Sequence, residues 1–112
     1  MPVQKWSDHI WVACLADDPP FSEDLDELHE KALTVESMPD VVLDLSGVDH
    51  LNSSNLSQLL RLRKRMKDRE AQLRLAGPSD NIWALFLATG LDKVFQFNED
   101  TSTALADLQI DK

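Results

Sequence analysis

A chain of 112 residues with 43% hydrophobic and 28% charged residues has the composition of one folded domain, expected over residues 1–112, and not of a disordered segment. Its formal net charge of −9 speaks against a general nucleic-acid binder, because such proteins neutralise phosphates with clustered Lys and Arg. The longest apolar runs, at 10–16 and 82–88, are far shorter than the roughly 20 residues that a membrane-spanning helix needs, so no direct membrane insertion is expected.

The first third of the chain predicts a strand followed by a helix. Residues 9–16, HIWVACLA, mix β-branched, aromatic and small apolar residues, and DDPP ends the strand that they predict. The single cysteine, Cys14, lies in this segment and is expected to be a small buried side chain. Ser22 is a suitable N-cap for the helix that follows. The expected apolar stripe of that helix consists of Leu25, Leu28, Ala32 and Leu33.

The middle of the chain alternates strand and helix. Residues 38–48, MPDVVLDLSGV, predict a buried strand, and QLRLAG at 72–77 predicts another. Between them, a helix is expected over about 53–70. Its predicted buried residues are Leu56, Leu59, Leu60 and Met66, and its predicted outward-facing residues are Arg61, Lys64, Arg65 and Arg69.

The last third predicts a helix at 79–90, which ends on Gly90, the residue type expected just past a helix end. A short strand at 94–97 and an amphipathic helix at 101–110 should follow. Strands that alternate with helices favour βαβ units. The predicted fold class is therefore α/β: a small mixed, largely parallel sheet with about four helices packed on it and an antiparallel or mixed edge formed by the early strands.

Charge is unevenly distributed along the chain. Residues 17–30 contain seven acidic residues and no Lys or Arg, whereas residues 61–74 hold seven of the eleven Lys and Arg. The basic segment is either a solvated helix face or a docking surface for an acidic partner protein.

Motifs for catalysis and for cofactor binding do not occur. The sequence has no GxSxG, Walker or GxGxxG pattern, and its three histidines have no cysteine or paired carboxylate at metal-ligand spacing. His50 lies near Ser54 and Asp44, but sequence proximity does not define a catalytic triad. We therefore expect no enzyme, no metal site and no cofactor. With no visible secretion signal and no second cysteine, the cytoplasm is the expected compartment.

The segment LNSSNL, residues 51–56, lies where a buried strand gives way to a helix. Asn52 or Ser53 can cap the free backbone N–H groups there, which is worth about 1 kcal/mol. A phosphate on a serine at this junction would add roughly −1.5 to −2 charges, and a helix N-terminus tolerates that charge. Helix capping and phosphate acceptance are both compatible with this segment.

The sequence from VVLDLSGV to VFQF resembles the STAS domain, named for sulfate transporters and anti-sigma factor antagonists. The parts that carry the resemblance are a strand ending in DLSGV, a serine-containing turn that opens a helix, a strand ending at AGPS, and TGLDKVF before the last strand. It extends over about residues 40–110 and covers the first forty only through their strand–strand–helix pattern. The resemblance implies a small mixed sheet with several helices, and for stand-alone bacterial members it implies an anti-sigma factor antagonist.

In that family a turn of the type Asp-Ser-Ser-Gly-Leu carries a serine that is phosphorylated by the anti-sigma factor, itself a protein kinase. The unphosphorylated antagonist binds this kinase and frees the sigma factor, and phosphorylation breaks the complex. Ser54 falls on the phosphoacceptor, and Ser53 is the second choice. Asn52 stands where the family usually has aspartate, and Asn55 where it usually has glycine.

Two functions follow as hypotheses. The first is a regulatory module that binds an anti-sigma factor, a serine protein kinase or another signalling protein and is switched by phosphorylation of Ser54. The second is a STAS scaffold that is not phosphorylated, either a subunit of a signalling complex or an accessory to a membrane transporter. Family members can also bind small molecules in a groove between sheet and helices, but the sequence contains no set of residues that indicates a ligand-binding or enzymatic role. The residues expected to contact the partner are Asn52, Asn55, Arg61, Lys64 and Arg65.

Overall fold

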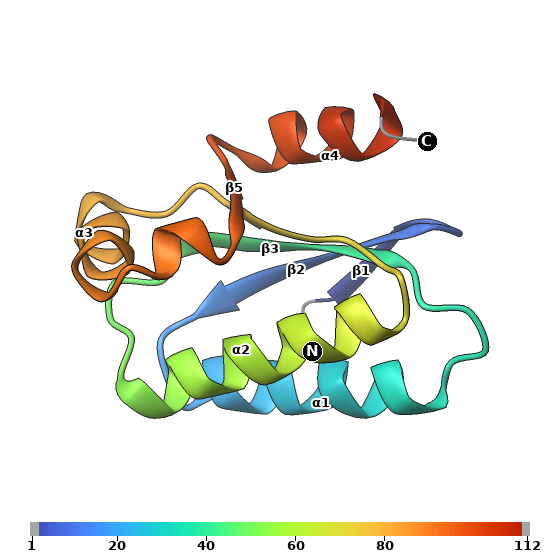
Figure 1. Ribbon diagram of the computed structural model, residues 1–112, viewed down its shortest axis with the longest axis horizontal. Helices are drawn as coiled ribbons and strands as arrows, with labels where there is room; N and C mark the ends of the chain where they lie inside the picture. Colours follow the sequence, from blue (N-terminus) through green and yellow to red (C-terminus); the bar gives the residue numbers. More distant parts are fainter. Residues whose placement is uncertain (1–2, 111–112) are drawn as a thin grey trace.

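The computed structural model describes residues 3–110, which form a five-stranded sheet with α-helices on both of its faces (Figure 1). The strands are β1 (Val3–Ser7), β2 (Ile10–Ala16), β3 (Asp40–Gly47), β4 (Leu73–Ala76) and β5 (Gln96–Asn98). The helices are α1 (Pro20–Thr34), α2 (Ser53–Asp68), α3 (Asp80–Thr89) and α4 (Thr101–Ile110), with a short 3-10 helix η1 (Leu91–Lys93) before β5.

The strands lie side by side in chain order, β1-β2-β3-β4-β5. β1 pairs with β2 antiparallel, and every other neighbouring pair is parallel. Parallel neighbours require a crossover connection, and α1 and α2 provide the first two. The predicted fold class, a mixed and largely parallel sheet with an antiparallel edge and four helices, is confirmed.

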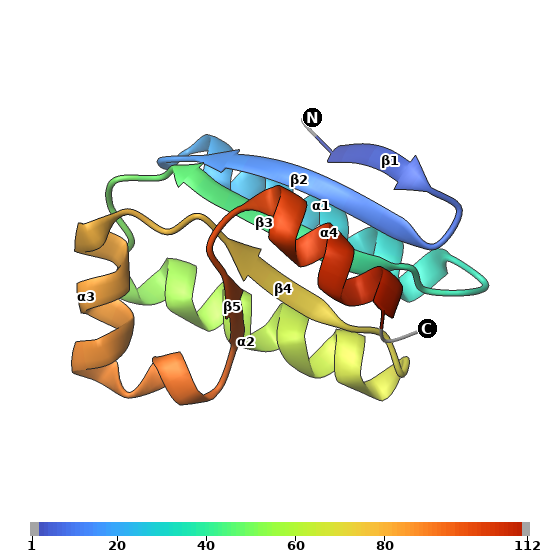
Figure 2. The same ribbon diagram turned by 90° about the horizontal axis from the view of Figure 1, so that it is seen from above.

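Two layers of helix cover the sheet. α1 and α2 lie side by side on one face, α4 lies on the other, and α3 lies beyond the carboxyl ends of β3 and β4 (Figures 1 and 2). The main core, between the sheet and α1 and α2, includes Val41, Leu43 and Leu45 of β3, and Val42 points to the opposite face under α4. β3 is covered on both faces, which is why its sequence is a nearly continuous apolar run.

The C-terminal helix is attached to the sheet by a small apolar cluster and a polar contact. The cluster consists of Ile10, Val12, Val42, Ala76, Ala104 and Leu108. Arg74 of β4, only 8% exposed, ion-pairs with Asp107 of α4 at 3.8 Å, and the Asn98 amide donates to the same carboxylate at 2.6 Å. Arg74 is therefore buried although it belongs to the basic segment of the sequence.

The structure corrects the predicted start and stripe of the first helix. α1 begins at Pro20 with Pro19 as N-cap, so Ser22 lies in the first turn and is not the cap. The buried face consists of Phe21, Leu25, Leu28 and Ala32, which repeat at heptad-like spacing. Leu33 is 54% exposed because it lies about 100° around the helix from Ala32.

The second helix differs from its prediction in the same way. Its buried face carries Leu59, Leu62 and Met66, as the i, i+3, i+7 spacing requires, whereas Leu60 is 38% exposed. Arg69 does not face outward, because its guanidinium donates to backbone carbonyls at the end of α1. Arg69 is thus part of the connection between the two helices.

Cys14 is exposed, contrary to its prediction as a buried side chain. It points to the same face of β2 as Ile10 and Val12, but α4 covers those two residues and leaves Cys14 open. The thiol lies 3.8 Å from Asp44 Oδ2, and its pKa is raised by partial burial and by the Asp44 carboxylate.

Along residues 3–110, no helix combines the length and the apolar character needed to cross a membrane.

Candidate functional site

The serine turn at the start of α2 is held by two asparagines that cap each other. Asn52 is the N-cap, and its side-chain Oδ1 accepts the backbone N–H of Asn55 at 2.8 Å. In return, Asn55 Oδ1 accepts the backbone N–H of Asn52 at 3.0 Å. This reciprocal capping box satisfies two backbone donors at the helix start. Of the two predicted caps, Asn52 is therefore confirmed, and Ser53 is the first helical residue.

Asn55 also connects the beginnings of α1 and α2. The residue is only 1% exposed, and its amide donates to Asp18 Oδ2 at 2.9 Å and to Ser22 Oγ at 3.3 Å. A buried amide with partners for its oxygen and its nitrogen stabilises a turn, whereas the same amide without partners would cost free energy. The side chain that replaces the family's usual glycine is thus directed inward and does not obstruct the surface of the turn.

Gln58, one turn further along α2, completes the contact with α1. It is 8% exposed, and its amide donates to the backbone carbonyl of Ser22 at 3.3 Å and to Asp26 Oδ1 at 3.2 Å. The Ser22 hydroxyl lies 2.7 Å from Asp18 Oδ1 and 3.1 Å from Gln58 Oε1. We call Asp18, Ser22, Asn55 and Gln58 the inter-helix network.

Two aspartates in the loop between β2 and α1 orient the segments on either side of the serine turn. The Ser22 hydroxyl and the Asn55 amide lower the pKa of Asp18 by hydrogen bonding to its carboxylate. The backbone N–H groups of His50, at 3.1 Å, and of Asp49, at 2.7 Å, lower the pKa of Asp17 in the same way. Both carboxylates therefore remain ionised at neutral pH and fix the loop that leads into α2.

Ser53 and Ser54 are exposed at the first and second positions of α2. The capping box uses the N–H of Asn55, and the N–H groups of the two serines have no carbonyl one turn earlier in the helix to accept them. The first turn contains no acidic residue. An anion at either serine would therefore meet free donors and the positive end of the helix dipole.

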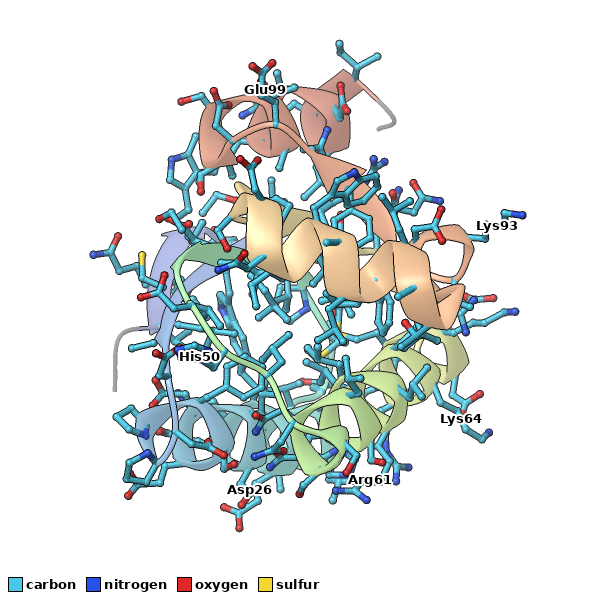
Figure 3. The ribbon with its side chains drawn as sticks, turned by 90° about the vertical axis from the view of Figure 1, so that its left-hand side faces the viewer. Asp26, His50, Arg61, Lys64, Lys93 and Glu99 are labelled. Carbon is cyan, nitrogen blue, oxygen red and sulfur yellow. The ribbon has the colours of Figure 1, made fainter. Side chains whose placement is uncertain are left out.

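The residues predicted to contact a partner fall into two groups. Arg61 and Lys64 are exposed and point away from the body of the protein (Figure 3), and Asn52 is exposed at the helix start. Arg65 is half-buried. Asn55 is in the interior, so it can affect a partner only through the shape of the turn.

Asp44 and His50, which lie near Ser54 in the sequence, make hydrogen bonds to other groups. Asp44 accepts the backbone N–H of Ser46 at 2.9 Å, while His50 contributes only its backbone N–H to the contact with Asp17 (Figure 3 labels His50 in the loop before α2). No cluster of three or more His, Cys, Asp or Glu side chains that could hold a metal ion occurs in residues 3–110.

Sequence reasoning did not find the inter-helix network. Asp18 and Ser22 lie 37 and 33 residues before Asn55 in the chain, so no local pattern connects them. The one available signal was a polar residue, Gln58, at a position of α2 that the helical spacing assigns to the buried face. A polar residue in such a position requires a hydrogen-bonding partner on the facing element.

Comparisons with known proteins agree with this architecture. A candidate anti-sigma factor antagonist from Thermotoga maritima is 14% identical, with a TM-score of 0.81 and coverage of 96% of this chain and 93% of that one. A variant of RsbS from Moorella thermoacetica, in which a serine is replaced by glutamate, is 18% identical, with a TM-score of 0.80 and coverage of 96% and 93%.

A third similar structure is a chain of the stressosome, described as a signal integration and transduction hub. It is 18% identical, has a TM-score of 0.74, and the match covers 96% of each chain. At these identities the similarity shows the fold and not the function. The search of the curated proteins found no matching sequence.

The sequence also matches a family model, that of the STAS domain, over residues 17–104. This match covers most of the chain and includes the loop of Asp18, the capped serine turn and two of the three parallel strand pairs, β3–β4 and β4–β5. The chain therefore belongs to the STAS domain family, as its sequence resemblance predicted.

Proposed function

We propose that this protein is a regulatory binding module of the anti-sigma factor antagonist type, switched by phosphorylation of Ser54 by a partner kinase. The observation that carries the proposal is that Ser54 is exposed at the second position of α2, a helix whose first turn is held by the reciprocal hydrogen bonds of Asn52 and Asn55. A kinase needs an accessible hydroxyl as phosphate acceptor. The Asn52–Asn55 capping box holds the start of the helix without using the Ser54 hydroxyl.

The physical effect of such a phosphate would be a change of surface and not of fold. It would add roughly −1.5 to −2 charges and three acceptor oxygens beside the free N–H groups of the first helical turn. Neither Asn52 nor the inter-helix network requires the Ser54 side chain for its hydrogen bonds. The phosphorylated protein should therefore remain folded and present a different charge to its partner.

The similar structures support the choice of partner class. One of them is a candidate anti-sigma factor antagonist, one is RsbS, and one belongs to the stressosome, a signalling assembly. Their fold is shared with this chain, and the analogy extends to function only as part of the proposal.

The test is a pull-down of the partner with and without ATP, followed by mass spectrometric mapping of phosphate on the recovered protein. We expect phosphate on Ser54 and an ATP-dependent loss of the partner. Ser54→Ala should keep the partner bound in the presence of ATP, and Ser54→Asp should weaken binding without ATP. Ser102→Asp is a matched control, because Ser102 is exposed at the second position of α4.

The proposal would be wrong if neither Ser53 nor Ser54 carried phosphate and Ser54→Asp bound the partner as the wild type does. That outcome would favour the second candidate, a constitutive STAS scaffold in a signalling complex or beside a membrane transporter. Asn52 and Asn55 favour this candidate, because they stand where the phosphorylated members of the family usually have aspartate and glycine. A scaffold predicts a complex whose affinity does not depend on ATP.

A further inference from the structure

A groove lined by residues of α1 and α2 carries an excess of positive charge on an acidic protein. Its lining consists of His29 from α1 and of Arg61, Lys64, Arg65 and Asp68 from α2, and its volume is about 430 Å³. The whole chain has a formal net charge of −9. A local excess of cations on such a protein cannot be explained as part of a generally basic surface.

The fold uses some cations of α2 internally and leaves the groove cations without strong partners. Arg63 donates to the backbone carbonyl of Val94 at 2.9 Å, and Arg69 donates to the carbonyls at the end of α1. In contrast, the buried Nε atom of Arg65 has no hydrogen-bond partner in the described part of the chain. Arg61, which lies exposed on the same helix, makes no hydrogen bond or ion pair within residues 3–110.

Lys64 is the groove cation that does have an acidic neighbour. Its Nζ lies 3.4 Å from Asp68 Oδ2, one helical turn away, and the two side chains are 78% and 55% exposed. An ion pair this exposed contributes little free energy, so a competing carboxylate can replace it at small cost. The groove therefore presents to an external carboxylate the exposed Arg61 guanidinium, the exposed Lys64 ammonium and the half-buried Arg65 guanidinium.

We propose that this groove docks an acidic segment, rich in Asp and Glu, of the signalling partner. A guanidinium has a planar fork of N–H donors that matches a carboxylate, and charge-assisted bonds of this kind are the stronger class of hydrogen bond. Arg61 and Lys64 are exposed and project from the groove into solvent, where the carboxylates of a peptide segment can contact them (Figure 3). The proposal rests on the proposed function only for the statement that the segment belongs to a signalling partner.

The position of Ser54 connects this groove to the phosphorylation site. Arg61 lies seven residues after Ser54 and Arg65 lies eleven residues after it, so the three side chains are on one face of α2. Along the helix axis, Ser54 is about 10 Å from Arg61. This separation is close to the screening length of physiological salt, which is about 8 Å. A phosphate on Ser54 would therefore oppose the docking of an acidic segment, and Ser53, about 100° around the helix, would oppose it less.

The experiment uses a fluorescein-labelled peptide of Glu and Leu as the probe and a twin peptide with Gln in place of Glu. Fluorescence anisotropy measures their binding to the full chain at about 0.02 M and about 0.2 M salt, where screening differs strongly. We expect the Glu peptide to bind, the Gln peptide not to bind, and salt to weaken the complex. The variant Arg61→Gln/Lys64→Gln/Arg65→Gln should bind about tenfold more weakly, as the loss of charge-assisted contacts implies.

A matched variant, Lys5→Gln/Lys67→Gln/Lys93→Gln, removes the same number of charges from exposed positions outside the groove. It should bind as the wild type does. Because Arg65 is half-buried, the double reversal Arg61→Glu/Lys64→Glu, at two exposed positions, tests the groove without disturbing packing. Thermal melts check that every variant is folded.

The proposal is overturned by any of four results: no binding of the Glu peptide, equal losses in the two triple variants, competition by inorganic phosphate as effective as that of unlabelled peptide, or self-association of the chain that the groove variant abolishes. The third result would indicate a small-anion site, and the fourth would indicate that residues 17–30 of a second copy occupy the groove. Whether phosphate is found on Ser54 does not depend on whether the Glu peptide binds. The proposed function and the proposed docking of an acidic segment are therefore tested separately.

Discussion

Asn55 combines two tasks that are usually divided among several residues. Its oxygen caps the backbone of Asn52, and its nitrogen reaches across to Asp18 and Ser22 at the start of α1. The Asn55 side chain itself is only 1% exposed, so its amide depends on these protein partners for its hydrogen bonds and not on water. The stability of the serine turn should therefore depend on Asn55 more than on either serine.

Substitution of Asn55 by alanine should cost about 2–3 kcal/mol of unfolding free energy, since it removes one half of the capping box and the hydrogen bonds to Asp18 and Ser22 at the start of α1. Asn52→Ala should cost about 1 kcal/mol, the typical value for a lost cap. Ser53→Ala, at an exposed position, is the control and should change stability by less than about 0.5 kcal/mol. Urea unfolding measures all three, and an Asn55→Ala effect no larger than that of Asn52→Ala would contradict this view of the turn.

Asp18 makes the stability of the turn depend on pH. Hydrogen bonds from Ser22 and Asn55 lower its pKa in the folded protein below the ordinary value of 3.8. A carboxyl group with a depressed folded-state pKa stabilises the protein above its unfolded-state pKa, and this contribution is lost as pH falls through the folded-state pKa. The difference in unfolding free energy between wild type and Asp18→Asn should thus be largest near neutral pH and should decrease as pH falls below 3.8. Urea unfolding across a pH series measures it, and a difference independent of pH would exclude the mechanism.

At the scale of the element, α2 distributes its cations between structure and surface. Arg63 and Arg69 donate to backbone carbonyls of other elements, while Arg61 and Lys64 extend into solvent. Arg69, just past the end of α2, donates hydrogen bonds to backbone carbonyls at the end of α1. Its Nη2 lies 2.6 Å from the carbonyl oxygen of Val35 and 3.0 Å from that of Glu36. A cationic side chain at a helix C-terminus donates hydrogen bonds to the free carbonyls of that helix, and its charge is attracted to the negative end of the helix dipole.

Arg69→Ala should therefore reduce the unfolding free energy by about 2 kcal/mol, in the range for hydrogen bonds to charged groups. Lys67→Ala is the matched control on the same helical turn. Lys67 is exposed, so its loss should cost less than about 0.5 kcal/mol. Equal effects of the two substitutions in urea unfolding would show that Arg69 contributes only as one charge of a solvated face.

The polar part of the attachment of α4 to the sheet is one carboxylate, that of Asp107. Asp107 accepts from the Asn98 amide at 2.6 Å and ion-pairs with Arg74, and the apolar contact beneath the helix is small. Asp107→Ala should raise amide hydrogen exchange in α4 by about tenfold while β3 and β4 stay protected, because weakly attached elements open locally before the whole protein unfolds. Gln109→Ala, at an exposed position of the same helix, should leave the exchange unchanged. Uniform deprotection of the sheet would contradict local opening.

At the scale of the whole molecule, the charge distribution is what a phosphate on Ser54 would alter. The chain is acidic overall, and two of its groove cations, Arg61 and Arg65, lie on the α2 face that carries Ser54. Long-range effects of this kind are electrostatic, so they weaken as added salt screens them. A steric effect of the phosphate would not depend on salt in this way.

Ser54→Asp should weaken binding of the Glu peptide by about three- to tenfold at low salt, and by clearly less at about 0.2 M salt. Ser102→Asp adds the same charge at the start of α4, on the opposite side of the sheet, and should have little effect (Figure 1). Fluorescence anisotropy provides the comparison. A loss of binding that is identical at both salt concentrations would point to direct contact with residue 54 and not to its charge.

Features that depend on neighbours in the chain could be predicted from the sequence alone. The alternation of strands and helices, a cap at Asn52 or Ser53, and Gly90 just past the end of α3 all depend on local hydrogen bonds and local side-chain periodicity, and the structure selects Asn52 as the cap. The STAS resemblance and the α/β fold class followed from their order, and both are confirmed.

Only the tertiary structure decided which face of each element is covered and which polar groups meet. Leu33, Leu60 and Cys14 are exposed because no neighbouring element covers them, and no local pattern encodes the position of that neighbour. Asn55 and Arg69 find their partners more than thirty residues away, across two helices that pack together only in the folded state. Local spacing specifies a helix and its cap within a few residues, whereas the serine turn acquires its rigid support only when the chain brings α1 beside α2.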